Sequence, residues 1–451
     1  MNDTSCIINN PSLTKEERLS ALRNYQKKNP APKGSGEINN HIHTIYSFSP
    51  YTPAMAALLS LNGGLAAAGS VDHDSIAAAQ EMLQACAILG IGGCVGFEAR
   101  VSFKTGANGK PSSFAARKIN NPDSEGIVYM TVQGISHNAT YRVAEFLVPI
   151  REERLKRTKA MTASANIILK EAGFSEINFD DDIRGKSKYD EGGGITERHL
   201  LAAATDKIIL KYGKGLELIE GIKQKLNITI SAKINALLAN SNNEHYLYDL
   251  LGVLKTDFLP RIFIQPDENE CIPADRVTSF AESIAAIPSY AYLGDVAESP
   301  TGDKKAEKFE DEFIEDLFAE LSRLGFRAVT YMPPRNTPEQ LIKVQRLCRE
   351  WNFMEISGVD INSSRQSFNC PEALKSEFRH LIDTTWALIA HERLTGVDKR
   401  LSLFAKDNPL ASLNLDKRLT VYAAFGKKLD LYSPDESAAV LAEEIKKGNV
   451  N

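Results

Sequence analysis

Four short apolar segments of this chain each end in side chains that can bind a metal ion. They are His41-Ile42-His43, Val71-Asp72-His73-Asp74, Gly96-Phe97-Glu98 and Gly358-Val359-Asp360. Alternate residues of a β-strand share a face, so His41 and His43 can reach the same ion. Barrels of parallel strands gather the ends of their strands at one mouth, which would bring His73 and Glu98 beside them. The pattern therefore predicts a divalent-metal centre at the mouth of a parallel sheet.

Each of these segments also has an ordinary explanation when it is taken alone. The histidine pair could be two surface or capped side chains on a strand. His73 could be a turn histidine held by a neighbouring aspartate, and Asp360 could cap the segment that follows it. Glu98 is harder to explain in this way, because a buried carboxylate without a cation is costly. The order of the segments along the chain favours metal binding by His41, His43, His73, Glu98 and Asp360.

Size and composition exclude several classes of protein. A chain of 451 residues can form one large domain with insertions or two domains. No apolar stretch reaches the roughly 20 residues that span a bilayer, and the polar N-terminus lacks the core of a secretory signal. We therefore expect a cytoplasmic protein with no membrane partner. A net charge of −5 gives no global reason for nucleic acid to be an obligate partner. The six cysteines show no CxxC spacing, which argues against a disulfide framework or a thiolate zinc site.

Strand-like and helix-like patterns alternate in two parts of the chain. Strands are predicted at 38–43, 64–71, 91–103, 284–293, 327–331 and 353–359. Helices are predicted at 53–61, 75–89, 309–324 and 338–351, with Ser75 as an N-cap. Strands separated by helices indicate parallel pairing with crossover connections.

The region between these two parts is different. Residues 104–125 predict a long mobile loop after the Glu98 strand; it could attract an anionic substrate or be a solvated surface insertion. Heptad-like spacing then predicts helices to about residue 259. We divide the chain into an N-terminal helical extension (1–36), an α/β unit (37–135 and 260–370), a helical insertion (136–259) and a C-terminal helical segment (371–451).

The order of the motifs resembles the PHP (polymerase and histidinol phosphatase) family of metal-dependent phosphoesterases. That family has HxHTxxSDG, TDHD, GxE, AHP and GSDxH segments around a helical insertion. Their counterparts here begin at His41, Val71, Gly96, Tyr290 and Gly358. Residues 195–202, ITERHLLA, resemble the RPHxARAL segment of the insertion. The resemblance spans about residues 37–370 and implies an α/β fold, a distorted (β/α)7 barrel of PHP type with an inserted helical subdomain.

Four positions depart from the family pattern. Phe48 stands at the acid of SDG, Tyr292 at the histidine of AHP, Asn362 at the last histidine, and Thr131 nearest a histidine that follows the GxE strand. The resemblance implies that the remaining ligands surround one ion: His41, His43, Glu98 and Asp360. Such a mixed nitrogen and oxygen set suits Zn²⁺, Mn²⁺ or Fe²⁺. His73, Asn362 and Tyr292 could supply only a weak site for a second ion.

The resemblance implies a metal-dependent hydrolase that acts on a small phosphate ester or nucleotide. The cation would acidify a water, with His73 and Asp360 as catalytic residues. Arg198, His199 and Arg335 would bind the oxygens of the small phosphorylated substrate. His199 could instead cap or pack its helix, and Arg335 could be a solvated loop residue.

Two other functions stay open. The four substitutions are also those expected of a degenerate PHP-like pseudoenzyme or binding module with one ion or none. A hydrolase of a non-phosphate bond is the third possibility. Rings of Phe48 and Tyr292 packed across the mouth would favour binding or structural use, whereas an open polar mouth would favour catalysis.

Overall fold

Seven strands form one sheet in which they follow one another in chain order. The computed structural model describes residues 3–30, 32, 34–105, 110–296 and 307–447. The strands are β1 (Ile38–Ile42), β2 (Ala67–His73), β3 (Gly92–Ser102), β4 (Ile127–Gln133), β5 (Ile287–Ala291), β6 (Ala328–Tyr331) and β7 (Met354–Ser357). All neighbours are parallel except β4, which is antiparallel to β3 and β5. The predicted strands that neighbour one another do pair in parallel, whereas β4 was not among the predicted strands. A loop joins β3 to β4, and an antiparallel pair needs no crossover helix.

The chain beyond β7 closes the sheet onto β1. The amide of His43 donates to the carbonyl of Ile361 at 2.9 Å, and the amide of Ile361 donates to His41 at 3.1 Å. Gly358 permits this approach, because a Cβ there would lie 2.5 Å from the amide nitrogen of His41. The predicted seven-stranded α/β barrel is thereby confirmed.

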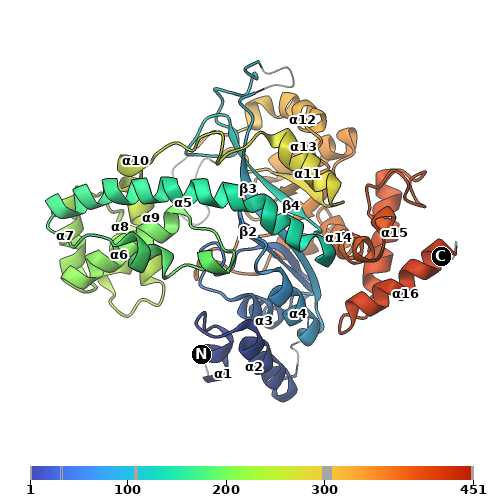
Figure 1. The fold of residues 1–451 in the computed structure, drawn as a ribbon, viewed down its shortest axis with the longest axis horizontal. Coiled ribbons are helices and arrows are strands. Elements are labelled where there is room, and N and C mark those ends of the chain that lie inside the picture. The colour runs from blue at the N-terminus through green and yellow to red at the C-terminus, as the bar shows by residue number, and fades with distance from the viewer. Residues whose placement is uncertain (1–2, 31, 33, 106–109, 297–306, 448–451) are drawn as a thin grey trace.

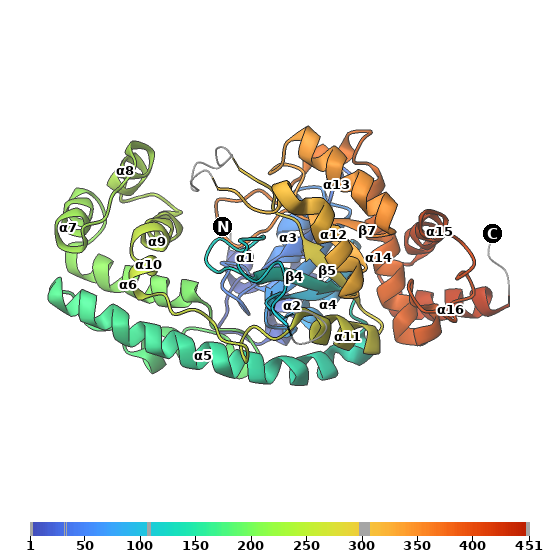
Figure 2. The same ribbon diagram turned by 90° about the horizontal axis from the view of Figure 1, so that it is seen from above.

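Helices cover the outside of the barrel (Figures 1 and 2). They are α3 (Pro53–Asn62), α4 (Ala79–Leu89), α11 (Ala274–Ser283), α12 (Ile314–Arg323) and α13 (Pro338–Trp351). The N-terminal α1 (Asp3–Ile8) and α2 (Lys15–Lys28) pack against α3 and α4. Ser75 is not the N-cap of α4, which begins four residues later. Its hydroxyl instead donates to the carbonyl of Gly192 at 2.8 Å and so links the barrel to the insertion.

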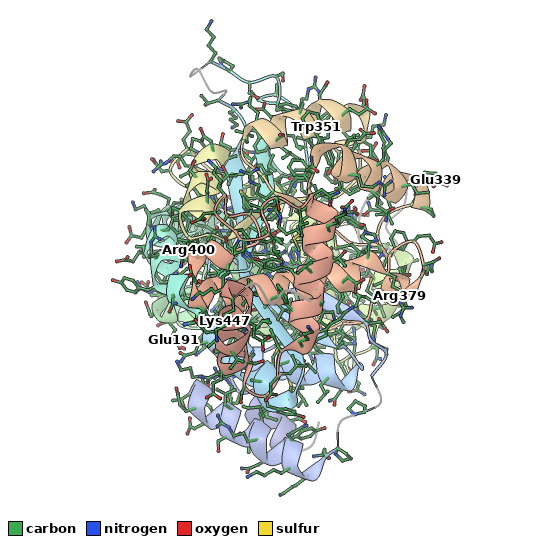
Figure 3. All side chains as sticks on the ribbon, turned by 90° about the vertical axis from the view of Figure 1, so that its right-hand side faces the viewer. Glu191, Glu339, Trp351, Arg379, Arg400 and Lys447 are labelled. Carbon is green, nitrogen blue, oxygen red and sulfur yellow. The ribbon has the colours of Figure 1, made fainter. Side chains whose placement is uncertain are left out.

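The C-terminal helix α14 (His380–Val397) covers the amino-terminal end of the barrel. The first residues of several strands, including Ile38, Ala67 and Met354, share a core with its apolar residues. The helices α15 (Leu415–Lys428) and α16 (Pro434–Lys446) pack on its outer side, which faces the viewer in Figure 3. This end of the barrel is therefore closed by helices.

The pH dependence of stability tests this closure. Burial raises the pKa of Glu392, on α14, to about 8, although Arg393 and the amide of Val95 oppose the rise. A folded-state pKa above the unfolded value stabilises the fold at low pH, and that contribution is lost as pH rises through the folded pKa. From pH 6 to pH 8 we expect the wild type to lose about 2 kcal/mol that Glu392→Gln does not lose. Urea unfolding of both proteins at the two pH values checks this, and parallel curves would contradict it.

The helices between β4 and β5 form a subdomain with its own core, which packs along the long helix α5 (Figure 1). Met161, Ala165 and Leu169, four residues apart on α5, are buried in that core. The helices are α5 (Thr140–Glu171), α6 (Glu197–Tyr212), α7 (Leu216–Leu226), α8 (Ala232–Ala239), α9 (Tyr246–Asp257) and α10 (Leu259–Ile262). This core extends three residues beyond the predicted end of the insertion at 259.

The predicted loop at 104–125 is not simply a solvated insertion. Phe114 and Ile119 are buried in the barrel core, and the ring of Phe114 meets Phe103 edge to face. Residues 106–109 of the loop lie outside the described residues. In the described part of the chain all six cysteines are free. None of the helices that the structure describes combines the length and apolar character needed to cross a membrane.

Candidate metal centre

His41, near the end of β1, and His43, directly after that strand, lie side by side inside the mouth of the barrel. Their ring centroids are 5.2 Å apart, and both residues are buried. The alternative of surface histidines is therefore wrong. Among the described residues, the Nε2 atoms of His41 and His43 are buried and have no hydrogen-bond partner. Buried polar atoms normally have partners, so these two nitrogens need an explanation.

Strand register brings His73 and Glu98 to the same place. The two residues are paired across the parallel strands β2 and β3, so their side chains share a face. The Nδ1 atom of His73 lies 2.9 Å from Oε2 of Glu98. The same oxygen is 3.5 Å from Nε2 of His43 and 3.8 Å from Nε2 of His41. Glu98 is thus the common neighbour of three histidines.

Closure of the barrel adds Asp360. This residue precedes Ile361, which pairs with β1, and its Oδ1 lies 3.2 Å from Nε2 of His43. It also accepts a hydrogen bond of 2.7 Å from Nδ2 of Asn362. The Asp360 side chain is 35% exposed and that of His73 is 21% exposed. Solvent therefore reaches the centre on this side.

The separations fit a shared cation. A tetrahedral ion with bonds of about 2.1 Å holds its ligand atoms roughly 3.4 Å apart. The contacts of His43 with Glu98 and Asp360, at 3.5 and 3.2 Å, match that spacing. Two overlapping groups, His41–His43–Asp360 and His43–His73–Glu98, each present ligand atoms within 4.8 Å of one another. The donors suit a divalent metal.

Hydrogen bonding around His43 gives an independent test of this fit. Ser47 donates its hydroxyl proton to Asp72 at 2.6 Å, so at 3.2 Å from Nδ1 of His43 it can only accept. The neutral ring then carries its proton on Nδ1, and the lone pair of Nε2 faces two carboxylates. A cation between them, or protonation of the ring, removes that repulsion.

The electrostatics keep the acids ionised. Burial alone raises the pKa of Glu98 and of Asp360, but the histidines beside them lower both pKa values below the ordinary range. Burial lowers the pKa of His73 despite the charge of Glu98. Burial also opposes protonation of His43, yet Asp360 and Glu98 raise its pKa overall. The centre therefore concentrates negative charge that a divalent ion would neutralise.

The four substituted positions do not seal the mouth. The ring of Phe48, at φ 103°, packs edge to face on His199 and near Tyr248, both on the helical insertion. Tyr292 is buried and donates its hydroxyl to Asp311 at 2.6 Å. Thr131 pairs in register with Glu98 and accepts from Gln133. Because Asp360 and His73 keep their exposure, the two rings leave the centre open on one side.

Of the three predicted anion-binding residues, Arg198 and His199 lie in the first turn of α6, and Arg335 follows β6. Arg198 donates from Nη1 to the carbonyl of Asn362 at 3.0 Å, and its charge helps to lower the pKa of Asp360. Nδ1 of His199 accepts from the amide of Thr196, so this histidine does cap its helix. Its neutral ring then carries a proton on Nε2 that it can donate to a ligand. Arg335 follows β6 and donates to the carbonyl of Leu293 at 3.0 Å.

Two residues near the ligands, Asp72 and Tyr129, were not predicted from the sequence. Asp72 accepts from the amide and hydroxyl of Thr44 and from Ser47, so it orients the loop after β1 and does not hold His73. Its signal was its place within the VDHD segment. Tyr129 was also missed; its ring lies 6.1 Å from that of His73.

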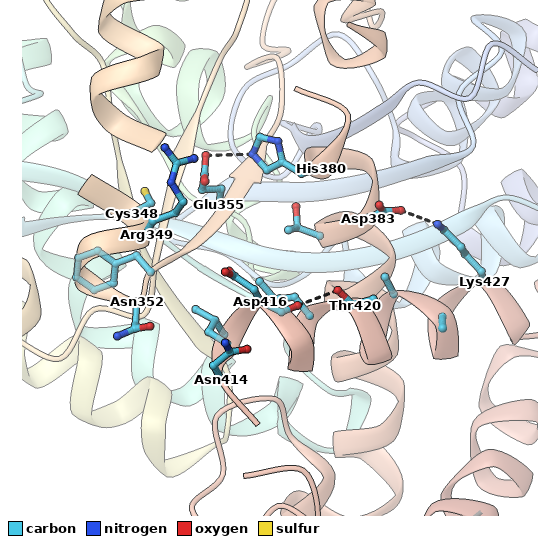
Figure 4. Close-up of a pocket in the computed structure, with 16 residues that line it drawn as sticks. Cys348, Arg349, Asn352, Glu355, His380, Asp383, Asn414, Asp416, Thr420 and Lys427 are labelled. Atoms are coloured by element: carbon cyan, nitrogen blue, oxygen red, sulfur yellow. Dashed lines mark hydrogen bonds and ion pairs between the residues drawn. The ribbon is translucent and has the colours of Figure 1, made fainter. Parts of the chain in front are cut away.

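A cavity of about 480 Å³ lies elsewhere (Figure 4). It is lined by residues of α13, α14 and α15 and by Glu355 near the start of β7. Asp360 lies beyond the other end of that strand. None of the predicted metal ligands lines this cavity, so its size does not bear on the metal centre.

Comparisons with known proteins give fold likeness only. No family model matches the chain, and no curated protein matches it. One similar solved structure is an amidohydrolase from Chromobacterium violaceum with bound sulfate and no metal: 17% identity, TM-score 0.48, covering 76% of this chain and 95% of that one. Another, from Bifidobacterium adolescentis, is assigned as a metal-dependent phosphoesterase: 15% identity, TM-score 0.48, covering 78% and 98%. The case for activity therefore rests on this chain's own residues.

Proposed function

We propose that this protein is a metal-dependent hydrolase of small phosphate esters. One observation carries the proposal. Two buried ring nitrogens without hydrogen-bond partners and two ionised carboxylates, from His41, His43, Glu98 and Asp360, converge at a solvent-reachable mouth. A group of this kind is costly to keep in a fold unless a cation uses it.

The residues have separate roles in this proposal. His41, His43, Glu98 and Asp360 would hold the ion. When bound, a divalent cation supplies Lewis-acid polarisation of a phosphoryl oxygen and acidifies a water molecule. His73 donates from Nδ1 to Glu98, which leaves its Nε2 atom to take a proton from attacking water.

Arg198 would bind the substrate. Its guanidinium lies beside Asp360, where it can donate to the oxygens of a phosphate held at the mouth. His199 is a second candidate, because its Nδ1 accepts from the amide of Thr196 and leaves the ring proton on Nε2. Arg335, which follows β6 on the barrel rim, is the third candidate for these contacts.

A pseudoenzyme or binding module is the second candidate function. It is favoured by Tyr292, whose hydroxyl is committed to Asp311 and so is not free to replace a ligand of a second ion. Phosphoesterases with two metals use the second ion to stabilise the attacking and leaving oxygens. The phosphoesterase would turn over a substrate, whereas the pseudoenzyme or binding module would not.

A panel of substrates separates these functions. The protein loaded with Zn²⁺, Mn²⁺ or Fe²⁺ is expected to hydrolyse at least one phosphate ester, and a chelator should abolish turnover. Arg198→Ala should raise KM about tenfold, because it removes a charge-assisted hydrogen bond to the anion. Stoichiometric metal without turnover under any of these cations would favour the pseudoenzyme. Turnover of carboxylic esters or amides alone would show a hydrolase of another bond.

A further inference from the structure

A buried cluster of six charged side chains lies next to the metal centre. It consists of three guanidinium groups and three carboxylates: Arg100, Arg154, Arg157, Asp74, Glu197 and Glu270. Each side chain is at most 13% exposed. Their formal charges cancel, which is the condition under which charges are tolerated inside a protein.

This cluster joins the barrel to the helical insertion. Arg100 lies two residues beyond Glu98 on β3, and Asp74 directly follows His73. Arg154, on α5, donates to Oδ2 of Asp74 at 2.5 Å. The cluster therefore includes close neighbours in sequence of two residues at the metal centre, His73 and Glu98.

Glu197 is the member that belongs to α6. Its carboxylate accepts from Arg100 at 3.2 Å, from Arg154 at 3.0 Å and from Arg157. Burial would raise the pKa of Glu197, but the three guanidinium groups lower that pKa well below the usual range. Glu197 is the first residue of α6, so these contacts fix the first turn of the helix in three directions.

The residue after Glu197 is Arg198, the proposed anion-binding residue. Successive side chains of a helix point about 100° apart, so the turn that directs Glu197 into the cluster directs Arg198 elsewhere. Arg198 reaches the carbonyl of Asn362, and the side chain of Asn362 donates to Asp360. The contacts thus run from the cluster through α6 to the metal centre.

We propose that Glu197 is a positioning residue that directs Arg198 to the mouth of the metal centre. The proposal rests on the proposed function only in taking an anion as what Arg198 binds there. Glu197 itself touches neither the metal ligands nor the proposed substrate. It acts through the geometry of α6.

A double-mutant cycle on the metal-loaded full chain tests this, with inorganic phosphate as the probe in calorimetry. Glu197→Gln and Arg198→Ala should each weaken phosphate binding about tenfold, and the double variant should bind no more weakly than Arg198→Ala. Metal stoichiometry should not change. Asp206→Asn, an exposed carboxylate on the same helix that pairs with Lys186, is the matched control and should bind as the wild type does.

Two results would overturn the proposal. One is phosphate binding by Glu197→Gln equal to that of the wild type; the other is full additivity of the two substitutions, which would indicate a separate structural effect. If Glu197→Gln does not fold, Glu197→Gln combined with Arg157→Gln keeps the cluster neutral and replaces it in the cycle.

A crystal structure of the Glu197→Gln variant decides the matter without reference to activity. We expect the guanidinium of Arg198 to have left the carbonyl of Asn362, and an unchanged contact would refute the positioning role. If the wild type binds no phosphate, the proposed function fails while this structure still tests the role of Glu197.

Discussion

Replacing Glu98 with glutamine is expected to weaken divalent-ion binding by more than about 100-fold, because changes to residues that only support a ligand already cost 10–100-fold. The Oε2 atom of Glu98 is the common neighbour of His41, His43 and His73, and its charge balances the cation. The amide of glutamine keeps the shape but not the charge. Titration with Zn²⁺ and Mn²⁺, followed by calorimetry, measures the loss.

Glu355→Gln provides the matched control. Glu355 is also a buried carboxylate on a barrel strand, but it bonds to Tyr331 and His380 at the cavity of Figure 4. We expect this variant to bind metal as the wild type does. Equal metal affinity in Glu98→Gln and the wild type would show that Glu98 is not a ligand.

The substitution Gly358→Ala should destabilise the protein by about 3 kcal/mol, at the upper end of the usual cost of overpacking. The new Cβ would lie 2.5 Å from the amide nitrogen of His41 and 2.6 Å from its Cβ. Relief of that clash must separate β1 from the segment that carries Asp360. We therefore expect metal affinity to fall together with the free energy of unfolding, measured by urea denaturation.

Gly252→Ala is the control for this substitution. Gly252 lies exposed in α9, and an added Cβ meets no atom within 4 Å. Alanine there should stabilise the protein by about 0.5–1 kcal/mol, because glycine is unfavourable inside a helix. A Gly358→Ala protein as stable as the wild type would contradict the proposed closure of the barrel.

Much of the fold and of the candidate centre could be predicted because local patterns determine them. Alternation along a strand placed His41 and His43 on one face, and the end of the next strand placed His73 near Glu98. The helix predicted at 338–351 has the bounds of α13, where Pro338 and the capping residue Thr337 mark its start. In each case a few neighbouring residues carry the signal.

The features that were missed depend on contacts between distant segments. The antiparallel placement of β4 follows from pairing with β5, more than 150 residues further on. The ion pairs of Glu197 were not predicted, because its three arginine partners come from two other elements, β3 and α5. Ser75 carried a local signal for an N-cap, but that prediction was wrong, because its hydroxyl bonds to the insertion. Tertiary contacts outweigh local preference at such positions.

We propose that four side chains of this protein bind a common cation. Elemental analysis of the purified protein, combined with anomalous diffraction at the absorption edge of the metal found, tests it most directly. We predict an anomalous peak within bonding distance of His41, His43, Glu98 and Asp360. A crystal that contains metal but shows no peak among these four residues, with Glu98 or Asp360 turned away from the histidines, would contradict it.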